Sequence, residues 1–176
     1  MQVLDAKTLK EYKKKYNFFA TNAALSAKAA DLLDTGRDLL VLDPSAGLGA
    51  LLKAAKEAMH HTAKFHYCEI QDVFHSSLRD FEYRGNDFME YNPGQMYDAI
   101  IMNPPYRNRQ AISHTEHAWK CLKSGGRIVT IVNRAAMDYI MEEFQGYMFH
   151  CELIKKGFAE TNIETYLILI IRPVYE

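Results

Sequence analysis

The sequence predicts an α/β domain in which a mostly parallel sheet carries helices on both of its faces. Short apolar runs alternate along the chain with segments of helical periodicity. A glycine-containing turn follows the first of these runs, and polar side chains stand at the ends of several others. Because open α/β sheets bind ligands at the carboxyl ends of their strands, these polar residues are the first candidates for a functional site.

The predicted helices begin and end at recognisable residues. A helix over 21–34 has Thr21 or Asn22 as its N-cap, an alanine-rich body and Gly36 just beyond its end. An N-terminal helical extension over 1–17 precedes it. The other expected helices run from the glycine turn to about 59 and over 72–78, 111–122 and 135–144.

The predicted strands are short and apolar, as expected for strands that are buried in a sheet. The last two are expected to form an antiparallel pair. The expected strands cover 39–42, 64–68, 81–84, 97–102, 127–132, 149–156 and 164–171.

The composition is that of an ordinary globular protein. With 176 residues, 48% of them hydrophobic and 24% charged, the chain can form one domain with a core of its own. The net charge of −1 means that nucleic-acid binding would require a local basic patch. No stretch approaches the ~20 apolar residues of a membrane span, and the N-terminus has no signal-type apolar core. We therefore expect a cytoplasmic protein without a membrane partner.

Cysteine and histidine positions give no indication of a metal site. The cysteines are odd in number, far apart and without metal-ligand spacing, which predicts reduced core thiols: Cys68, Cys121 and Cys151. The histidines that invite a metal interpretation lack matching ligands and are expected on the surface or in loops: His60, His61, His114 and His117.

The turn after the first strand combines an acid with two glycines. Gly47 and Gly49 permit positive φ and let a ligand approach the backbone closely. The third glycine of the dinucleotide fingerprint is absent, since Leu52 stands in its place. Asp43 would repel a diphosphate and instead favours a cationic or hydroxyl-bearing ligand. The alternative is a plain strand-to-helix turn.

Further acids stand at the ends of the next strands. Glu69 can accept both hydroxyls of a ribose, and Ile70 can form one wall for an adenine ring. Asp87 and Phe88 follow the third strand and could hold the amine and the face of that ring. A nucleoside-type pocket is predicted by the series of strand-end residues: Asp43, Glu69, Asp87 and Asn103.

The tetrapeptide Asn103-Pro104-Pro105-Tyr106 follows the buried strand over 97–102. Two prolines leave the backbone few conformations, so its carbonyls can be oriented before a substrate arrives. An amide oxygen, a fixed carbonyl and a flat ring suit an amino group attached to a planar system. The alternative is a rigid strand exit with a packed tyrosine.

These segments resemble the class I S-adenosylmethionine-dependent methyltransferases, and among them the enzymes that methylate the N6 amine of adenine. The segment 43–49 resembles the cofactor glycine motif in its DP-x-x-G-x-G form. Glu69 matches the ribose-binding acid, and Asp87-Phe88 the adenine-contacting pair. The segment 103–106 matches the catalytic [DNS]-P-P-[YFW] motif.

The resemblance implies a Rossmann-like methyltransferase fold with a seven-stranded, mostly parallel sheet whose last strand is antiparallel. It also implies S-adenosyl-L-methionine as the cofactor. The segment 18–21 is similar to one in which the threonine contacts the methionine end of the cofactor, although the family usually has Thr-Pro where this chain has Thr21-Asn22. The implied cofactor-binding residues are Thr21, Asp43, Ser45, Gly47, Gly49, Glu69, Ile70, Asp87, Phe88 and Asn103.

The expected activity is direct in-line methylation of adenine N6 in nucleic acid, with DNA favoured over RNA. The Asn103 side-chain oxygen and the Pro104 carbonyl would accept the amine hydrogens, and Tyr106 would stack on the base. Pro105 completes the catalytic motif. Phe158 is a second stacking candidate, with a core phenylalanine as the equal alternative.

Basic residues near this motif could bind phosphates. Arg107 and Arg109 directly follow the catalytic tyrosine. The lysine run over 7–15 could join them, although an exposed helix face is the preferred interpretation.

The methyltransferase domain is expected to span residues 1–176, with no separate target-recognition domain. Short loops or a partner protein would then read the substrate, or specificity would be low. Protein glutamine N-methylation is the alternative activity, and a non-catalytic cofactor-binding subunit is the alternative of another class.

Overall fold

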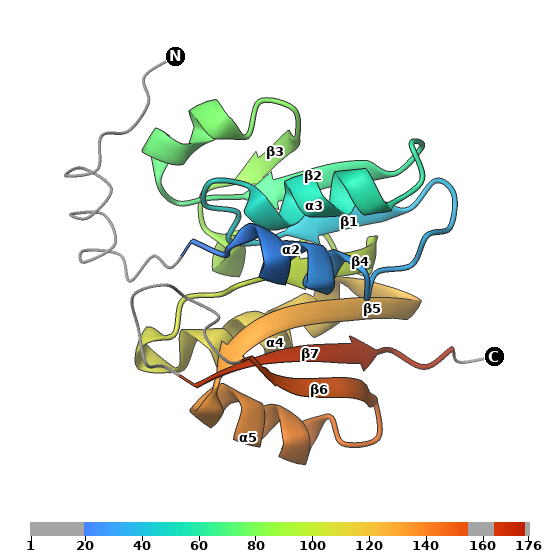
Figure 1. Ribbon diagram of the computed structural model, residues 1–176, viewed down its shortest axis with the longest axis vertical. Coiled ribbons are helices and arrows are strands. Elements are labelled where there is room, and N and C mark those ends of the chain that lie inside the picture. Colours follow the sequence, from blue (N-terminus) through green and yellow to red (C-terminus); the bar gives the residue numbers. More distant parts are fainter. Residues whose placement is uncertain (1–19, 155–163, 175–176) are drawn as a thin grey trace.

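The computed structural model describes residues 20–154 and 164–174, so the extension predicted over 1–17 lies outside the described residues. Its centre is a seven-stranded sheet in the order β3-β2-β1-β4-β5-β7-β6 (Figure 1). Strands β1 to β5 pair in parallel, whereas β7 is antiparallel to both of its neighbours. The predicted fold class is therefore confirmed.

The strands are β1 (Leu40–Asp43), β2 (Lys64–Cys68), β3 (Glu82–Gly85), β4 (Tyr97–Met102), β5 (Leu122–Asn133), β6 (Met148–Ile154) and β7 (Thr165–Ile171). The α-helices are α2 (Ala23–Ala30), α3 (Ala50–Ala58), α4 (Gln110–Cys121) and α5 (Arg134–Glu143). Three short 3₁₀ helices are also present among the described residues: η1 (Asp72–Ser77), η2 (Phe88–Glu90) and η3 (Arg107–Arg109).

The sheet separates two apolar layers, and this explains the continuous apolar run over 99–102 in β4. In β4, Ile100 and Met102 face one layer with α4 and α5. Ala99 and Ile101 face the other layer with α2 and α3. A strand covered on both faces buries successive side chains and shows no alternation of apolar and polar residues.

Strand β5 begins five residues before its predicted start at 127. The strand passes through Gly125, which has a φ of 77°, and its register with β4 shifts between Tyr97 and Ala99. An irregularity of this kind adds residues to one strand without ending the pairing. The glycines that resembled a break between helix and strand therefore lie inside the strand.

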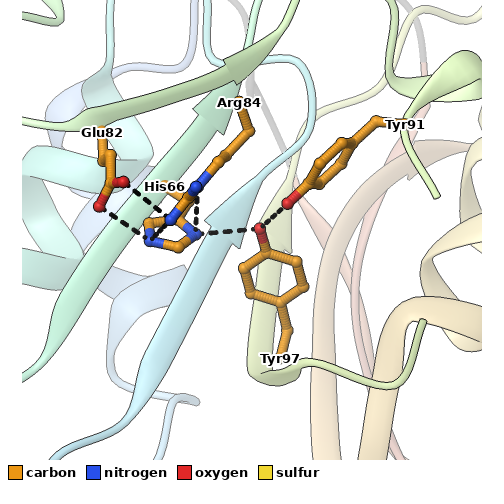
Figure 2. Close-up of polar contacts among 5 residues, drawn as sticks. All are labelled: His66, Glu82, Arg84, Tyr91 and Tyr97. Carbon is orange, nitrogen blue, oxygen red and sulfur yellow. Dashed lines mark hydrogen bonds and ion pairs between the residues drawn. The ribbon is translucent and has the colours of Figure 1, made fainter. Parts of the chain in front are cut away.

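A polar cluster joins β2, β3 and β4 (Figure 2). Nδ1 of the buried His66 lies 3.0 Å from the Tyr97 hydroxyl, which lies 2.9 Å from the Tyr91 hydroxyl. Arg84 Nε donates to the same Nδ1 at 3.0 Å and is itself paired with Glu82. Burial, followed by the charge of Arg84, lowers the pKa of His66. The cluster anchors Tyr91, and with it the segment between β3 and β4 that contributes to the ligand cavity described below.

The cysteine prediction is wrong at one position. Cys68 and Cys121 are buried free thiols, but Cys151 is exposed. Cys151 lies on the edge strand β6, where every second side chain is exposed. Within the described ranges, no helix is long and apolar enough to cross a membrane.

Candidate active site

A cavity of about 370 Å³ opens at the carboxyl ends of the parallel strands. The structure brings the four predicted strand-end residues together on its wall: Asp43, Glu69, Asp87 and Asn103. Other predicted site residues that line it are Thr21, Ser45, Ile70, Phe88, Pro104, Pro105 and Arg107. Phe158 lies outside the described residues.

The glycine turn has the backbone conformation that the sequence predicts. Gly47 has a φ of 53° and Gly49 a φ of 77°. The Gly47 amide donates to Glu69 Oε2 at 2.6 Å, which ties the turn to the end of β2. Gly49 is also packed closely, because a Cβ atom there would lie 2.7 Å from Cδ2 of the buried Leu78.

Replacing Gly49 with alanine should lower the free energy of unfolding by more than the cost of placing alanine in a left-handed backbone conformation. A left-handed conformation costs a residue with a side chain roughly 1–2 kcal/mol, and the contact with Leu78 should add roughly 1–3 kcal/mol. Gly94→Ala is the matched control, since Gly94 has a φ of 70° and no described atom within 4 Å of a Cβ atom there. Urea unfolding would test this, and equal destabilisation of the two variants would contradict it.

Asp43 is a buried acid with an incomplete set of partners. The residue is 1% exposed, and its Oδ1 accepts from the Ser45 amide at 3.1 Å. Its Oδ2 is buried and has no hydrogen-bond partner within the described residues. Burial raises the pKa of Asp43 to about 8. A buried carboxylate with an unpaired oxygen fits a ligand that brings positive charge or a hydrogen-bond donor.

Glu69 is 4% exposed and lines the same cavity. Its oxygens accept from the amides of Gly47, at 2.6 Å, and Gln71, at 2.8 Å. Burial nevertheless raises the pKa of Glu69. Each carboxylate oxygen can accept more than one hydrogen bond, so the side chain can also accept ligand hydroxyls. The neighbouring Ile70 is 62% exposed and forms an apolar part of the wall.

Asn103 is held in a defined orientation at the end of β4. Its Nδ2 donates to Thr21 Oγ1 at 3.2 Å, and its Oδ1 accepts from the Tyr106 hydroxyl at 3.0 Å. The Ser45 hydroxyl donates to the Asn103 backbone carbonyl at 3.4 Å. Of the two predicted N-cap residues it is Asn22 that caps α2, by accepting from the Leu25 amide. The contacts of Asn103 join the segment before α2, the glycine turn and the end of β4.

Tyr106 is not among the residues that line the cavity and packs against both apolar layers. Burial raises its pKa. Arg107 lines the cavity, whereas the Arg109 guanidinium lies 6.0 Å from the centroid of the Tyr139 ring. Asn108 and Arg109 both have positive φ, at 51° and 60°. Strained backbone of this kind is concentrated at functional sites, and no pattern in the sequence predicts it here.

Two of the predicted surface histidines are instead buried in α4. His117 Nε2 lies 2.9 Å from the Tyr91 carbonyl oxygen, and His114 lines the cavity. The prediction was wrong for both because the helical spacing of Ala111, Ala118 and Cys121 places positions 114 and 117 on the buried face. The described part of the chain contains no group of three or more His, Cys, Asp or Glu that could hold a metal ion.

Residues 25–158 match the family model of the methyltransferase small domain. The chain belongs to this family. No sequence among the curated proteins matches the chain. As a methyltransferase small domain, the protein uses S-adenosyl-L-methionine as its cofactor.

Solved structures of other proteins share the fold of this methyltransferase. A putative RNA methyltransferase from Pyrococcus horikoshii is 16% identical, with a TM-score of 0.72 over 97% of this chain and 100% of its own. A SAM-dependent O-methyltransferase from Thermotoga maritima is 17% identical, with a TM-score of 0.69 over 96% of this chain and 72% of its own.

A modification subunit of a putative type I restriction enzyme from Vibrio vulnificus is 16% identical, with a TM-score of 0.67 over 96% of this chain. The present chain spans 48% of that subunit's length. At these identities the similarities show the shared fold.

The cavity residues of the methyltransferase fit the chemistry of this cofactor. The cofactor is a cation that carries a ribose and an adenine. The unpaired, buried Oδ2 of Asp43 suits positive charge or a donor, and Glu69 can accept hydroxyls. Asp87 and the exposed Ile70 supply an acceptor and an apolar wall for a base.

Proposed function

We propose that this methyltransferase methylates the N6 amine of adenine in nucleic acid, with DNA favoured over RNA. The observation that carries the proposal is the position of the tetrapeptide Asn103-Pro104-Pro105-Tyr106. At the end of β4, Asn103, Pro104 and Pro105 line the cavity whose other residues fit the cofactor. A planar amine held at this point would lie beside the methyl donor.

The proposed positions of the cofactor follow from the walls of the cavity. Glu69 would accept the ribose hydroxyls, and Asp87 would accept the adenine amine between Ile70 and Phe88. Thr21, Asp43, Ser45 and the glycine turn would hold the methionine end. When bound, S-adenosyl-L-methionine supplies a methyl group activated on a sulfonium.

Asn103 would act on the target amine rather than on the methyl donor. The lone pair of an adenine amine is delocalised into the ring, and acceptors on both hydrogens favour a pyramidal, nucleophilic nitrogen. Asn103 Oδ1 already accepts from Tyr106, and an amide oxygen has a second lone pair for the amine. The bond from Nδ2 to Thr21 Oγ1 holds the amide against the segment before α2. The Pro104 carbonyl would accept the second hydrogen.

Tyr106 would stack on the target base, which requires its ring to turn from the apolar layers toward the cavity. Its hydroxyl bond to Asn103 Oδ1 would then be replaced by the bond from the amine. In a duplex the base must first be flipped out at a few kcal/mol, and stacking returns roughly 1–3 kcal/mol. An amide is a weak base, so the proton of the methylated amine would pass to water.

Among the described residues, two arginines after the tetrapeptide are the candidates for binding substrate outside the cavity. The exposed Arg107 lines the cavity mouth and suits a phosphate. The Arg109 guanidinium lies over the Tyr139 ring, so it would bind a phosphate that approaches beside Tyr139. We also propose that a partner protein contributes to sequence recognition.

Transfer of a tritiated methyl group into separate pools of DNA, RNA and protein would test this proposal. Label in DNA, and to a smaller extent in RNA, is the expected result. Label in protein glutamine alone would replace the proposal by the alternative activity. Cofactor binding without transfer to any pool would point to a non-catalytic subunit.

A further inference from the structure

His114 is a buried side chain on the cavity wall that the proposed transfer step does not use. It lies on α4 and is 7% exposed. Its Nδ1 atom is buried and has no hydrogen-bond partner among the residues that the structure describes. Leaving a buried polar atom unpaired costs free energy, so such atoms in native proteins call for a physical explanation.

The packing of the helix does not provide that explanation, as the neighbouring His117 shows. Both rings pack against Phe88, with centroid distances of 5.5 Å for His114 and 4.6 Å for His117. His117 nevertheless has a partner, because its Nε2 lies 2.9 Å from the Tyr91 carbonyl oxygen. A ring nitrogen on this face of α4 can therefore find a partner within the protein, whereas Nδ1 of His114 has none among the described residues.

The charge state of His114 limits what it can bind. Burial lowers the pKa of His114 to about 4, even though the carboxylate of Asp87 acts in the opposite direction. At neutral pH the ring is uncharged and offers one N–H donor and one nitrogen acceptor. Such a ring complements a neutral heterocycle better than a phosphate or a carboxylate.

We infer that His114 donates a hydrogen bond to a ring nitrogen of the cofactor's adenine, at N1 or N7 beside the exocyclic amine. The inference rests on the proposed position of the adenine between Ile70 and Phe88. Asp87 lines the same cavity, and its Oδ1 caps η2 by accepting from the Met89 amide at 2.9 Å. Its carboxylate keeps lone pairs for the amine, and His114 supplies the donor that a carboxylate lacks. Together they would make the site specific for adenine among nucleobases.

Calorimetric binding of S-adenosylhomocysteine and its 1-deaza and 7-deaza analogues would test this inference as a double-mutant cycle. Wild-type protein should bind one of the analogues roughly 3- to 10-fold more weakly than S-adenosylhomocysteine, as expected for one lost hydrogen bond. His114→Ala should bind S-adenosylhomocysteine more weakly by a similar factor and lose its sensitivity to that analogue. The matched variant His117→Ala should keep the wild-type sensitivity.

Equal affinity of the wild-type protein for all three ligands would overturn the inference, as would undiminished sensitivity in His114→Ala. A second measurement does not depend on that variant folding. In wild-type protein with 15N-labelled histidine, S-adenosylhomocysteine should shift a ring-nitrogen resonance of His114, assigned by comparison with His114→Gln. An unchanged resonance at saturation would contradict the contact. Both measurements report cofactor binding and not methyl transfer. The contact of His114 with the cofactor can therefore be disproved while adenine methylation is supported, and adenine methylation can be disproved while the contact is supported.

Discussion

An Asn103→Ala variant is expected to transfer methyl groups about 10²- to 10³-fold more slowly than the wild-type protein, while its affinity for S-adenosylhomocysteine changes far less. Loss of one group that stabilises charge developing in a transition state has about this effect on kcat. Alanine removes the acceptor for the amine but leaves Asp43, Glu69 and the glycine turn in place. Single-turnover transfer and calorimetric binding separate the two effects.

The control for this prediction is Asn103→Asp, which keeps an acceptor at the same position. It should retain more activity than the alanine variant, because a carboxylate can accept from the amine and also from the Thr21 hydroxyl that now accepts from Asn103. Transfer by Asn103→Ala at the wild-type rate would contradict the proposed role. Loss of cofactor binding in both variants would show that Asn103 acts mainly on the cofactor.

An Asp43→Asn variant is expected to bind the cofactor much more weakly and yet to be more stable without it. The buried Oδ2 has no described partner, and ionising it in the folded protein costs free energy. Removing the charge should raise the free energy of unfolding at pH 8 by roughly 3–6 kcal/mol, because the rise in the pKa of Asp43 on folding costs about 1.4 kcal/mol for each tenfold change in its acid constant. The same change removes the carboxyl group that can ionise when a cationic ligand binds beside it. Opposite effects on stability and on ligand binding are common where a functional site contains groups that destabilise the folded protein.

The stability that Asp43→Asn gains over the wild-type protein should increase with pH. Folding raises the pKa of Asp43 from its ordinary value of 3.8 to about 8. Between these pH values the folded state binds more protons than the unfolded state, so Asp43 lowers stability as the pH rises. The advantage of Asp43→Asn should therefore grow from about pH 4 to pH 8 and then level off.

Urea unfolding at pH 5, 7 and 9 would measure this difference. Asp98→Asn is the matched control, because Asp98 Oδ2 accepts from the Leu40 amide and its Oδ1 pairs with Lys123. Both oxygens are partnered, so that substitution should destabilise the protein. A stability difference between wild type and Asp43→Asn that does not change with pH would mean that the carboxyl is not buried as described.

Two strands have the bounds that the sequence predicts. Residues 64–68 and 97–102 are strands β2 and β4 as predicted. Each run ends at a polar residue, Glu69 or Asn103, and local sequence is sufficient to find it. The helix predicted over 21–34 ends earlier, at Ala30, since the residues that follow leave the helical hydrogen-bonding pattern and turn toward β1.

The candidate site was predictable where it depends on strand ends, because topology alone brings strand ends together. Asp43, Glu69, Asp87 and Asn103 reach one cavity for this reason. The packing of Tyr106 against both apolar layers was not predictable, because it depends on tertiary contacts and on the bond to Asn103. The burial of His114 could have been predicted from the helical spacing of the apolar residues in α4. The histidines were instead considered only as metal ligands, and they lack the spacing of such ligands.

The chemical identity of the methylated product tests the central proposal most directly. DNA and RNA labelled by the wild-type protein would be digested to nucleosides and analysed by mass spectrometry, with Asn103→Ala as the control. We expect N6-methyladenine nucleoside, more from DNA than from RNA, and a strongly reduced amount with the variant. Methyl groups found on another base, on a ribose hydroxyl or only on protein would contradict the proposed function.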